Sequence, residues 1–221
     1  MPHDRPFEVI GFHSCTRKIG LAALNGEIDL NLSDNPWDWL GKGLYFWEQN
    51  PLRSLEYGIE SALHKQYNKV PIETPFVLGA IIELGNCLNL LEPESLALIQ
   101  QAHSELEMVH NNLGTPLPKN DSVNTGNRRL DCAVIKHLHK SAENKPNLKY
   151  DTIRCAFVEG EPIYKTANFT SRLHIQVCVL NPNLIRGFFL PRPINTYNPY
   201  LKKDFNIEEY LKEHPQKPKE S

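Results

Sequence analysis

The feature that most constrains the fold is the stretch 38–57, which reads DWLGKGLYFWEQNPLRSLEY. It contains a loop punctuated by glycines, then a short aromatic run, and then the pair Asn50-Pro51. Asparagine followed by proline is typical of a helix start, because Asn caps the free N–H groups and Pro already has the backbone angle of the first turn. The stretch therefore predicts a loop, a strand-like run and a helix in close succession.

The predicted helix separates polar from apolar side chains. Ser54 and Tyr57 are three residues apart and therefore share a face of the helix. A separate apolar stripe is formed by Leu52, Leu55, Ile59 and Leu63. We expect the stripe to pack into the core, while the hydroxyl and the ring line a pocket for a flat ring with polar edges, such as nicotinamide.

Alternation and turn residues predict the other elements. We expect a strand over 7–14, a helix over 16–25, a loop over 27–43 and a buried strand with a turn over 76–91. Helices are expected at 94–112 and 128–142, and strands at 150–158, 171–180 and 184–190, the last two forming a hairpin that ends the sheet. Two interpretations of Trp37 and Trp39 in the loop stay open: a clamp onto the core, or a lid over a bound ligand.

Three separated motifs resemble the poly(ADP-ribose) polymerase and diphtheria-toxin-like branch of the ADP-ribosyltransferases. They are F-H-S-C at 12–15, G-K-G-L-Y-F at 41–46 with the Ser54–Tyr57 pair, and Q-V-C-V-L-N-P-N-L-I at 176–185. The resemblance covers residues 7–90 and 150–191. It implies an α+β ADP-ribosyltransferase fold, a split antiparallel β-sandwich with flanking helices, in which NAD binds as co-substrate.

The resemblance also implies roles for individual residues. Its cofactor-binding positions fall on His13, Ser14, Gly43, Tyr45, Ser54 and Tyr57. His13 would bind the adenine-side ribose, and the backbone of Ser14 and the hydroxyl of Ser54 would hold the nicotinamide carboxamide. Tyr45 and Tyr57 would sandwich the cationic ring, which gains roughly 1 kcal/mol from aromatic faces.

The third motif departs from the family pattern, which carries a glutamate where this chain has Gln176. The implied catalytic triad is therefore His13, Tyr45 and Gln176. A glutamine can accept a hydrogen bond from a ribose hydroxyl, but it cannot act as a general base. We therefore expect transfer of a single ADP-ribose unit. Candidates for a substitute base or an acceptor contact are Glu48, Glu159, Glu161 and His174.

The function implied is mono-ADP-ribosyl transfer from NAD to a protein or nucleic-acid acceptor, with release of nicotinamide, as in a bacterial toxin or effector with an antitoxin or immunity partner. One alternative is an inactive module that binds NAD or ADP-ribose, which Gln176 favours. Another is a relative that modifies nucleic acid, by ADP-ribosylating a base or transferring a phosphate to NAD; the net charge of -2 disfavours it. Phosphate contacts would then come from Arg128, Arg129 and the cluster at 137–140.

Length and composition set the remaining expectations. The 221 residues predict a single domain, 1–221, with a helical insertion at 92–149 and a flexible tail at 203–221. The five cysteines have no metal-binding spacing and predict buried thiols in a reducing compartment. The N-terminus has no apolar signal core, and no stretch is apolar enough to span a membrane. We expect a cytoplasmic protein with no membrane partner, although export by a route that reads no N-terminal signal is compatible with these features.

Overall fold

The computed structural model describes residues 8–63, 72–121, 127–143, 149–201 and 212, and it has mixed α+β content. The strands are β1 (Glu8–Thr16), β2 (Leu44–Glu48), β3 (Pro75–Glu83), β4 (Cys87–Asn89), β5 (Thr152–Phe157), β6 (His174–Val179) and β7 (Ile185–Phe189). The α-helices are α1 (Arg17–Leu24), α2 (Pro51–Leu63), α3 (Pro93–Leu113), α4 (Arg129–Ala142) and α5 (Ile194–Tyr197). Short 3-10 helices are η3 (Pro182–Leu184) and η4 (Pro199–Leu201).

The strands form one hydrogen-bonded sheet in the order β4-β5-β6-β2-β1-β3-β7. The expected split sandwich of two antiparallel sheets is wrong in two points, because the strands belong to one sheet and because β4 and β5 run parallel. The link between the two parts of the sheet is short, because β1 and β2 pair only at Gly11 with Glu48 and at Phe12 with Trp47. We call this link the seam.

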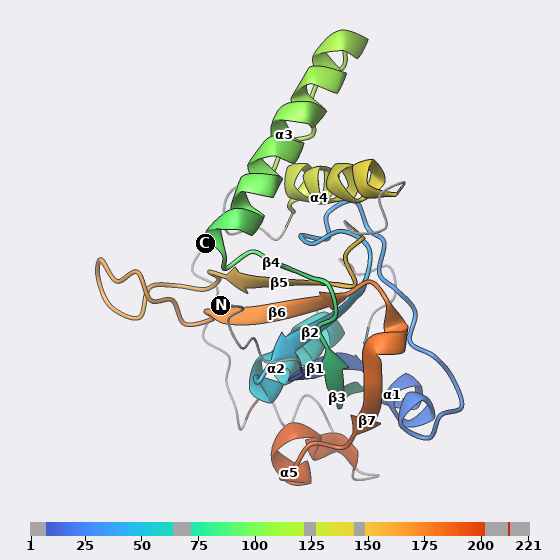
Figure 1. Cartoon of the computed structure of the whole chain (residues 1–221). Helices are drawn as coiled ribbons and strands as arrows, with labels where there is room; N and C mark the ends of the chain where they lie inside the picture. The colour runs from blue at the N-terminus through green and yellow to red at the C-terminus, as the bar shows by residue number, and fades with distance from the viewer. Residues whose placement is uncertain (1–7, 64–71, 122–126, 144–148, 202–211, 213–221) are drawn as a thin grey trace, which may run out of the picture.

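The sheet folds over at the seam, so that its two parts face each other. One buried cluster draws side chains from both parts: Val9, Cys15, Leu44, Phe46, Leu78, Ala80, Ile82, Val177 and Val179. In Figure 1, β4, β5 and β6 lie above β1, β3 and β7, with α3 and α4 beyond β4. The main core therefore lies inside the folded sheet.

The predicted hairpin of the last two strands is wrong. β6 pairs with β2 and β5, whereas β7 pairs with β3 at the opposite edge of the sheet. The 3-10 turn η3, capped by the Asn181 side chain, carries the chain across the core from one part of the sheet to the other. Alternation identifies a strand but does not identify its neighbour, which the folding of the sheet decides.

The helix α2 covers β1 on the face away from the main core. Leu55 and Ile59 pack with Phe12 and Val77 in a cluster of their own. The predicted apolar stripe is too wide, because Leu52 and Leu63 at the two ends of the helix are exposed. The same buried face of α2 also carries Ser54 and Gly58, and this places two polar or small positions against β1.

The helices predicted at 94–112 and 128–142 are present as α3 and α4, which lie between β4 and β5 in the chain. They pack on each other through Ala102, Leu106 and Val134. The buried side of α3 is narrow, because Ala102 and Leu106 are buried whereas Leu96 and Val109 are exposed. Ile135 of α4 belongs to the buried cluster on the sheet, and Ile99 of α3 packs against the same cluster, so both helices are attached there.

Several expectations concern single features. All five cysteines are free thiols; Cys15, Cys132 and Cys178 are buried and the other two are half-buried. No helix in the described part of the chain has the length and apolar character needed to cross a membrane. The expected tail at 203–221 lies outside the described residues, apart from position 212.

Candidate active site

Ser14 lies on β1 just beyond the seam, and its backbone faces the diverging strand β2. Opposite Ser14 on β3 is Val77, whose N–H and C=O are both bonded to the side chain of Asn198, at 2.8 and 3.0 Å. In an antiparallel pair, opposing residues exchange both backbone hydrogen bonds or neither. The N–H and C=O of Ser14 therefore point to the β2 side, where β2 has already separated from β1.

The same direction follows from the other end of β1. The carbonyl oxygen of Ile10 accepts a hydrogen bond from Gln49, at the end of β2, so the even-numbered residues of β1 point their backbone groups toward β2. Beyond Phe12 these groups have no strand partner in the described part of the chain. The seam thus leaves one backbone donor and one backbone acceptor of the buried Ser14 without a strand partner, which is the pattern that pairs with a carboxamide.

The side chains around Ser14 leave polar atoms unpaired. Within the described residues, Ser14 Oγ, Ser54 Oγ and Trp47 Nε1 are buried and have no hydrogen-bond partner. Ser54 lies one turn before Gly58 on the buried face of α2, and a Cβ on Gly58 would collide with Ser14 Oγ, so both serines lie where α2 packs on β1. Buried polar atoms without a partner are rare, and each calls for a ligand, a water or strain.

His13 is the side-chain link between β1 and β2. Its Nδ1 lies 2.9 Å from the carbonyl oxygen of Tyr45, which can only accept, so Nδ1 carries the proton. Burial lowers the pKa of His13, so the ring is neutral at pH 7 and Nε2 is an acceptor. The ring lies beside Phe46, with centroids 5.6 Å apart. His13 starts from the core face of β1, opposite to Ser14.

The aromatic run of β2 presents Tyr45 and Trp47 on one face of the sheet. The ring partner of Tyr57 from α2 is Trp47, at 5.0 Å between centroids. Trp47 in turn lies 6.4 Å from the ring of His174. Sequence reasoning assigned no role to Trp47, although its two-residue spacing from Tyr45 places it on the same face. Tyr57 is half-exposed at the end of this aromatic row.

The hydroxyl of Tyr45 holds the glycine loop. It donates to the carbonyl of Gly41 at 2.6 Å and accepts from the N–H of Leu40 at 3.1 Å. Burial raises the pKa of Tyr45 far above its usual range, so the phenol stays protonated. Gly43 pairs with Ser33 through both backbone bonds, and a side chain there would meet Cys178 of β6.

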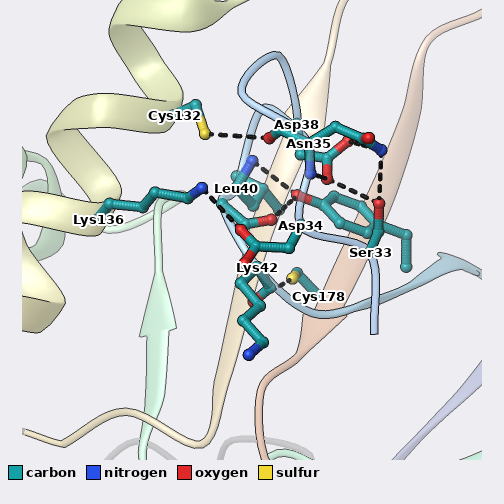
Figure 2. Close-up of polar contacts among 11 residues, drawn as sticks. Ser33, Asp34, Asn35, Asp38, Leu40, Lys42, Cys132, Lys136 and Cys178 are labelled. Carbon is teal, nitrogen blue, oxygen red and sulfur yellow. Dashed lines mark hydrogen bonds and ion pairs between the residues drawn. The ribbon is translucent and has the colours of Figure 1, made fainter. Parts of the chain in front are cut away.

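Figure 2 shows the polar contacts that hold the loop before β2 in place. The Asp38 carboxylate accepts from the hydroxyl of Ser33 and from the N–H of Asn35, each at 2.7 Å. Lys136 of α4 reaches the loop by an ion pair with Asp34, also at 2.7 Å. These bonds tie the segment 33–42 to the sheet and to α4.

Of the two loop tryptophans, Trp39 packs on Phe157 of β5, with ring centroids 4.7 Å apart. The guanidinium of Arg128 also lies over the Trp39 ring, 5.2 Å from its centroid. Trp39 also belongs to the sheet-side cluster, which favours the clamp interpretation over the lid. Arg128 also pairs with Asp131 at 2.7 Å, so this candidate phosphate contact already has two partners.

Gln176 and His174 lie two apart on β6 and touch each other. The side-chain Nε2 of Gln176 lies 3.0 Å from Nε2 of His174, whose Nδ1 lies 2.6 Å from the carbonyl oxygen of Arg172. Gln176 stands opposite Trp47 of β2 and Cys155 of β5. The predicted triad therefore occupies three neighbouring strands. The side chains of Tyr45 and Gln176 lie on one face of the sheet, and His13 lies on the other, where its ring contacts Phe46 and the backbone carbonyl of Tyr45.

The carboxylates suggested as a substitute base are bound elsewhere or exposed. Glu159 makes an ion pair with Arg53 of α2 at 2.9 Å, and Glu161 is exposed. Glu48 holds Arg154 by two bonds of 2.6 and 2.8 Å on the core side of β2, away from Gln176. Arg53, a buried cation that sequence reasoning missed, pins the segment after β5 to α2.

A cavity of about 370 Å³ lies between the sheet and the helices α3 and α4, beside Gln176 and His174 of β6. It shares Cys155 and Phe157 of β5 with the surroundings of Gln176 and His174. Its walls are mainly apolar and contain Asp131 but no Arg or Lys, so it suits an apolar group and not a pyrophosphate.

Comparisons with protein-family models, with curated proteins and with solved structures find no significant match to this chain. The case for a function therefore rests on the arrangement at the seam and on the resemblance of the three motifs.

Proposed function

We propose that this chain is a mono-ADP-ribosyltransferase that splits NAD and transfers one ADP-ribose unit to a macromolecular acceptor. Two features carry the proposal. The backbone edge of Ser14 has no strand partner among the described residues, and the buried hydroxyl of Ser54, on the face of α2 that packs on β1, has no partner there either. A primary carboxamide has one acceptor oxygen and a donor nitrogen, and it can match a peptide N–H and C=O pair. The hydroxyl of Ser54 offers the third hydrogen bond.

The nicotinamide ring itself needs an apolar and aromatic surface. The row of Tyr57 and Trp47 supplies aromatic faces on the side of the sheet to which Ser14 and Ser54 belong. A cationic ring gains about 1 kcal/mol on such faces. This row replaces the expected Tyr45–Tyr57 pair as the aromatic contact that the geometry supports, while Tyr45 acts through its hydroxyl on the glycine loop.

His13 and Gln176 supply acceptors for ribose hydroxyls. The free nitrogen of neutral His13 is Nε2, and the free atom of the Gln176 amide is its carbonyl oxygen. In the reaction the bond between the ribose C1′ and the nicotinamide nitrogen breaks, and its electron pair leaves with neutral nicotinamide. The ribose becomes oxocarbenium-like, and an acceptor nucleophile then forms the new bond at C1′ and loses its proton to solvent.

The lack of a carboxylate at position 176 sets the scope of the reaction. A glutamine does not remove a proton from a weak nucleophile, and Glu159 is held by Arg53. We therefore propose acceptors that are nucleophilic by themselves, and a single transfer. The same substitution supports a second candidate, a module that binds NAD or ADP-ribose and turns nothing over.

The two candidates separate when NAD labelled on its adenylate half is incubated with the protein in a cell lysate. Transfer predicts released nicotinamide and label on protein or on nucleic acid, and the labelled fraction names the acceptor class. Label that ends in free ADP-ribose would indicate a hydrolase. Binding of NAD with no release of nicotinamide would contradict transfer and support the binding module.

A further inference from the structure

We propose that His174 is a positioning residue that orients the amide of Gln176, so that the carbonyl oxygen of Gln176 faces the substrate. This inference rests on the proposed function and deepens it. The sequence alone suggested His174 as a base or an acceptor contact. The hydrogen bonds of β6 give it a different role, because its basic nitrogen is already in use.

The direction of each hydrogen bond follows from the chain of partners. The carbonyl oxygen of Arg172 can only accept, so Nδ1 of His174, 2.6 Å away, is the donor. In the neutral ring Nε2 then has a lone pair and no proton. The atom of Gln176 at 3.0 Å from Nε2 must therefore be the NH₂ group, which donates. The opposite amide orientation would place two acceptors against each other.

The ring of His174 is fixed by its neighbours. It stacks on Phe157 of β5, with centroids 5.6 Å apart and planes 12° apart, and Trp47 of β2 lies on another side. The side chain is buried, and burial lowers the pKa of His174, which keeps the ring in the neutral form. The charged groups that face it are Arg53 of α2 and Glu159, which pair with each other.

This arrangement solves a problem that a glutamine creates. A carboxylate offers an acceptor oxygen whichever way it turns, whereas an amide offers an acceptor on one side and a donor on the other. Only the orientation that His174 enforces leaves the oxygen free for a ribose hydroxyl. With the amide reversed, Gln176 would present its NH₂ group to a developing positive charge.

The test is a double-mutant cycle on nicotinamide release with His174→Phe and Gln176→Glu, singly and together. Phenylalanine keeps a ring on Phe157 but has no nitrogen. In the wild-type background, His174→Phe is expected to lower the release rate about ten-fold, the worth of one oriented hydrogen bond. In the Gln176→Glu background, it is expected to change the rate by less than about two-fold, because a carboxylate needs no orientation. An equal loss in both backgrounds, as a purely structural role would give, overturns the proposal.

The ¹⁵N shifts of the His174 ring are a second readout that needs no activity. A neutral ring with the proton on Nδ1 and a bare Nε2 supports the proposal, and the tautomer protonated on Nε2 overturns it. If the wild type binds NAD but releases no nicotinamide, the proposed function fails, and the tautomer still decides the orientation of Gln176.

Discussion

The imidazole Nδ1 of His13 lies 2.9 Å from the carbonyl oxygen of Tyr45, at the point where the backbone pairing of their two strands ends. The His13 side chain thus connects β1 and β2 just beyond their last backbone pair. Beyond it, β1 turns the N–H and C=O of Ser14 toward the opening between the strands. The geometry of the candidate site depends on this separation.

The link through His13 predicts a pH dependence of stability. Burial lowers the pKa of His13 below its ordinary 6.5, so between these two values the unfolded chain binds more protons than the folded chain. The contribution of His13 is therefore complete above pH 6.5 and falls as the pH drops below it, by at most about 1.4 kcal/mol per pH unit.

The measurement is urea unfolding at several pH values, with His13→Gln as the comparison. Glutamine keeps a donor for the Tyr45 carbonyl but does not titrate. His139 and His174 titrate alike in both chains, so the difference in slope belongs to His13. Equal slopes in the two chains would contradict the buried neutral ring.

Ser54→Ala should separate stability from ligand binding. The hydroxyl of Ser54 is buried without a partner, so its removal is expected to raise the free energy of unfolding by about 1 kcal/mol. The affinity for NAD should fall about ten-fold, because the carboxamide loses a hydrogen bond. Urea unfolding and calorimetric titration with NAD measure the two effects.

Ser61→Ala is the matched control on the same helix. Ser61 is also buried, but its hydroxyl accepts from the N–H of Ile72 at 3.4 Å. Its removal should lower stability and leave NAD affinity unchanged. If Ser54→Ala destabilises the fold as Ser61→Ala does and binds NAD normally, the Ser54 hydroxyl is not part of the site.

Tyr45→Phe should loosen the glycine loop. The phenol hydroxyl satisfies both Leu40 and Gly41, and without it a buried donor and a buried acceptor lose their partner. We expect a loss of about 1–2 kcal/mol in the free energy of unfolding. Tyr164→Phe, at an exposed position, should have no effect. An unchanged stability of Tyr45→Phe would show that the loop does not depend on this hydroxyl.

Gly58→Ala tests how α2 lies on β1. A methyl group at Gly58 would collide with Ser14 Oγ and come within 3.0 Å of the Cβ of Pro75. Alanine is the better helix former, yet the collision should cost about 1–3 kcal/mol. Ser14→Ala in the same chain should recover part of this loss. If Gly58→Ala raises the melting temperature, α2 does not lie against Ser14 as described.

Much of the fold follows from local patterns. The start of α2 at Pro51 agrees with the Asn50-Pro51 signal, and α1 ends just before Gly26, whose positive φ of 74° suits a glycine. Alternating apolar and polar residues indicate strands with one buried face, and a continuous apolar run indicates β3, which is buried on both faces. These signals are local in the chain, and they act within a few residues of each other.

The rest depends on contacts between distant segments. The crossing of β7 to the opposite edge depends on the folding of the sheet over its core, which no window of sequence contains. The side chain of Asn198, far along the chain, bonds the backbone N–H and C=O of Val77. This contact shows that the backbone groups of Ser14, opposite Val77, point away from β3 toward β2. The contact of Gln176 with His174 had a sequence signal, since residues two apart on a strand share a face.

The most direct test of the account is nicotinamide release from NAD by the purified protein. The account predicts release by the wild type, and a loss of most of it in His13→Ala and in Gln176→Ala, with both variants still folded. Ser61→Ala, the control on α2, should retain the wild-type rate. Release that is absent in the wild type, or that persists unchanged in both variants, would contradict the central claim that the seam between β1 and β2 is an NAD-cleaving site.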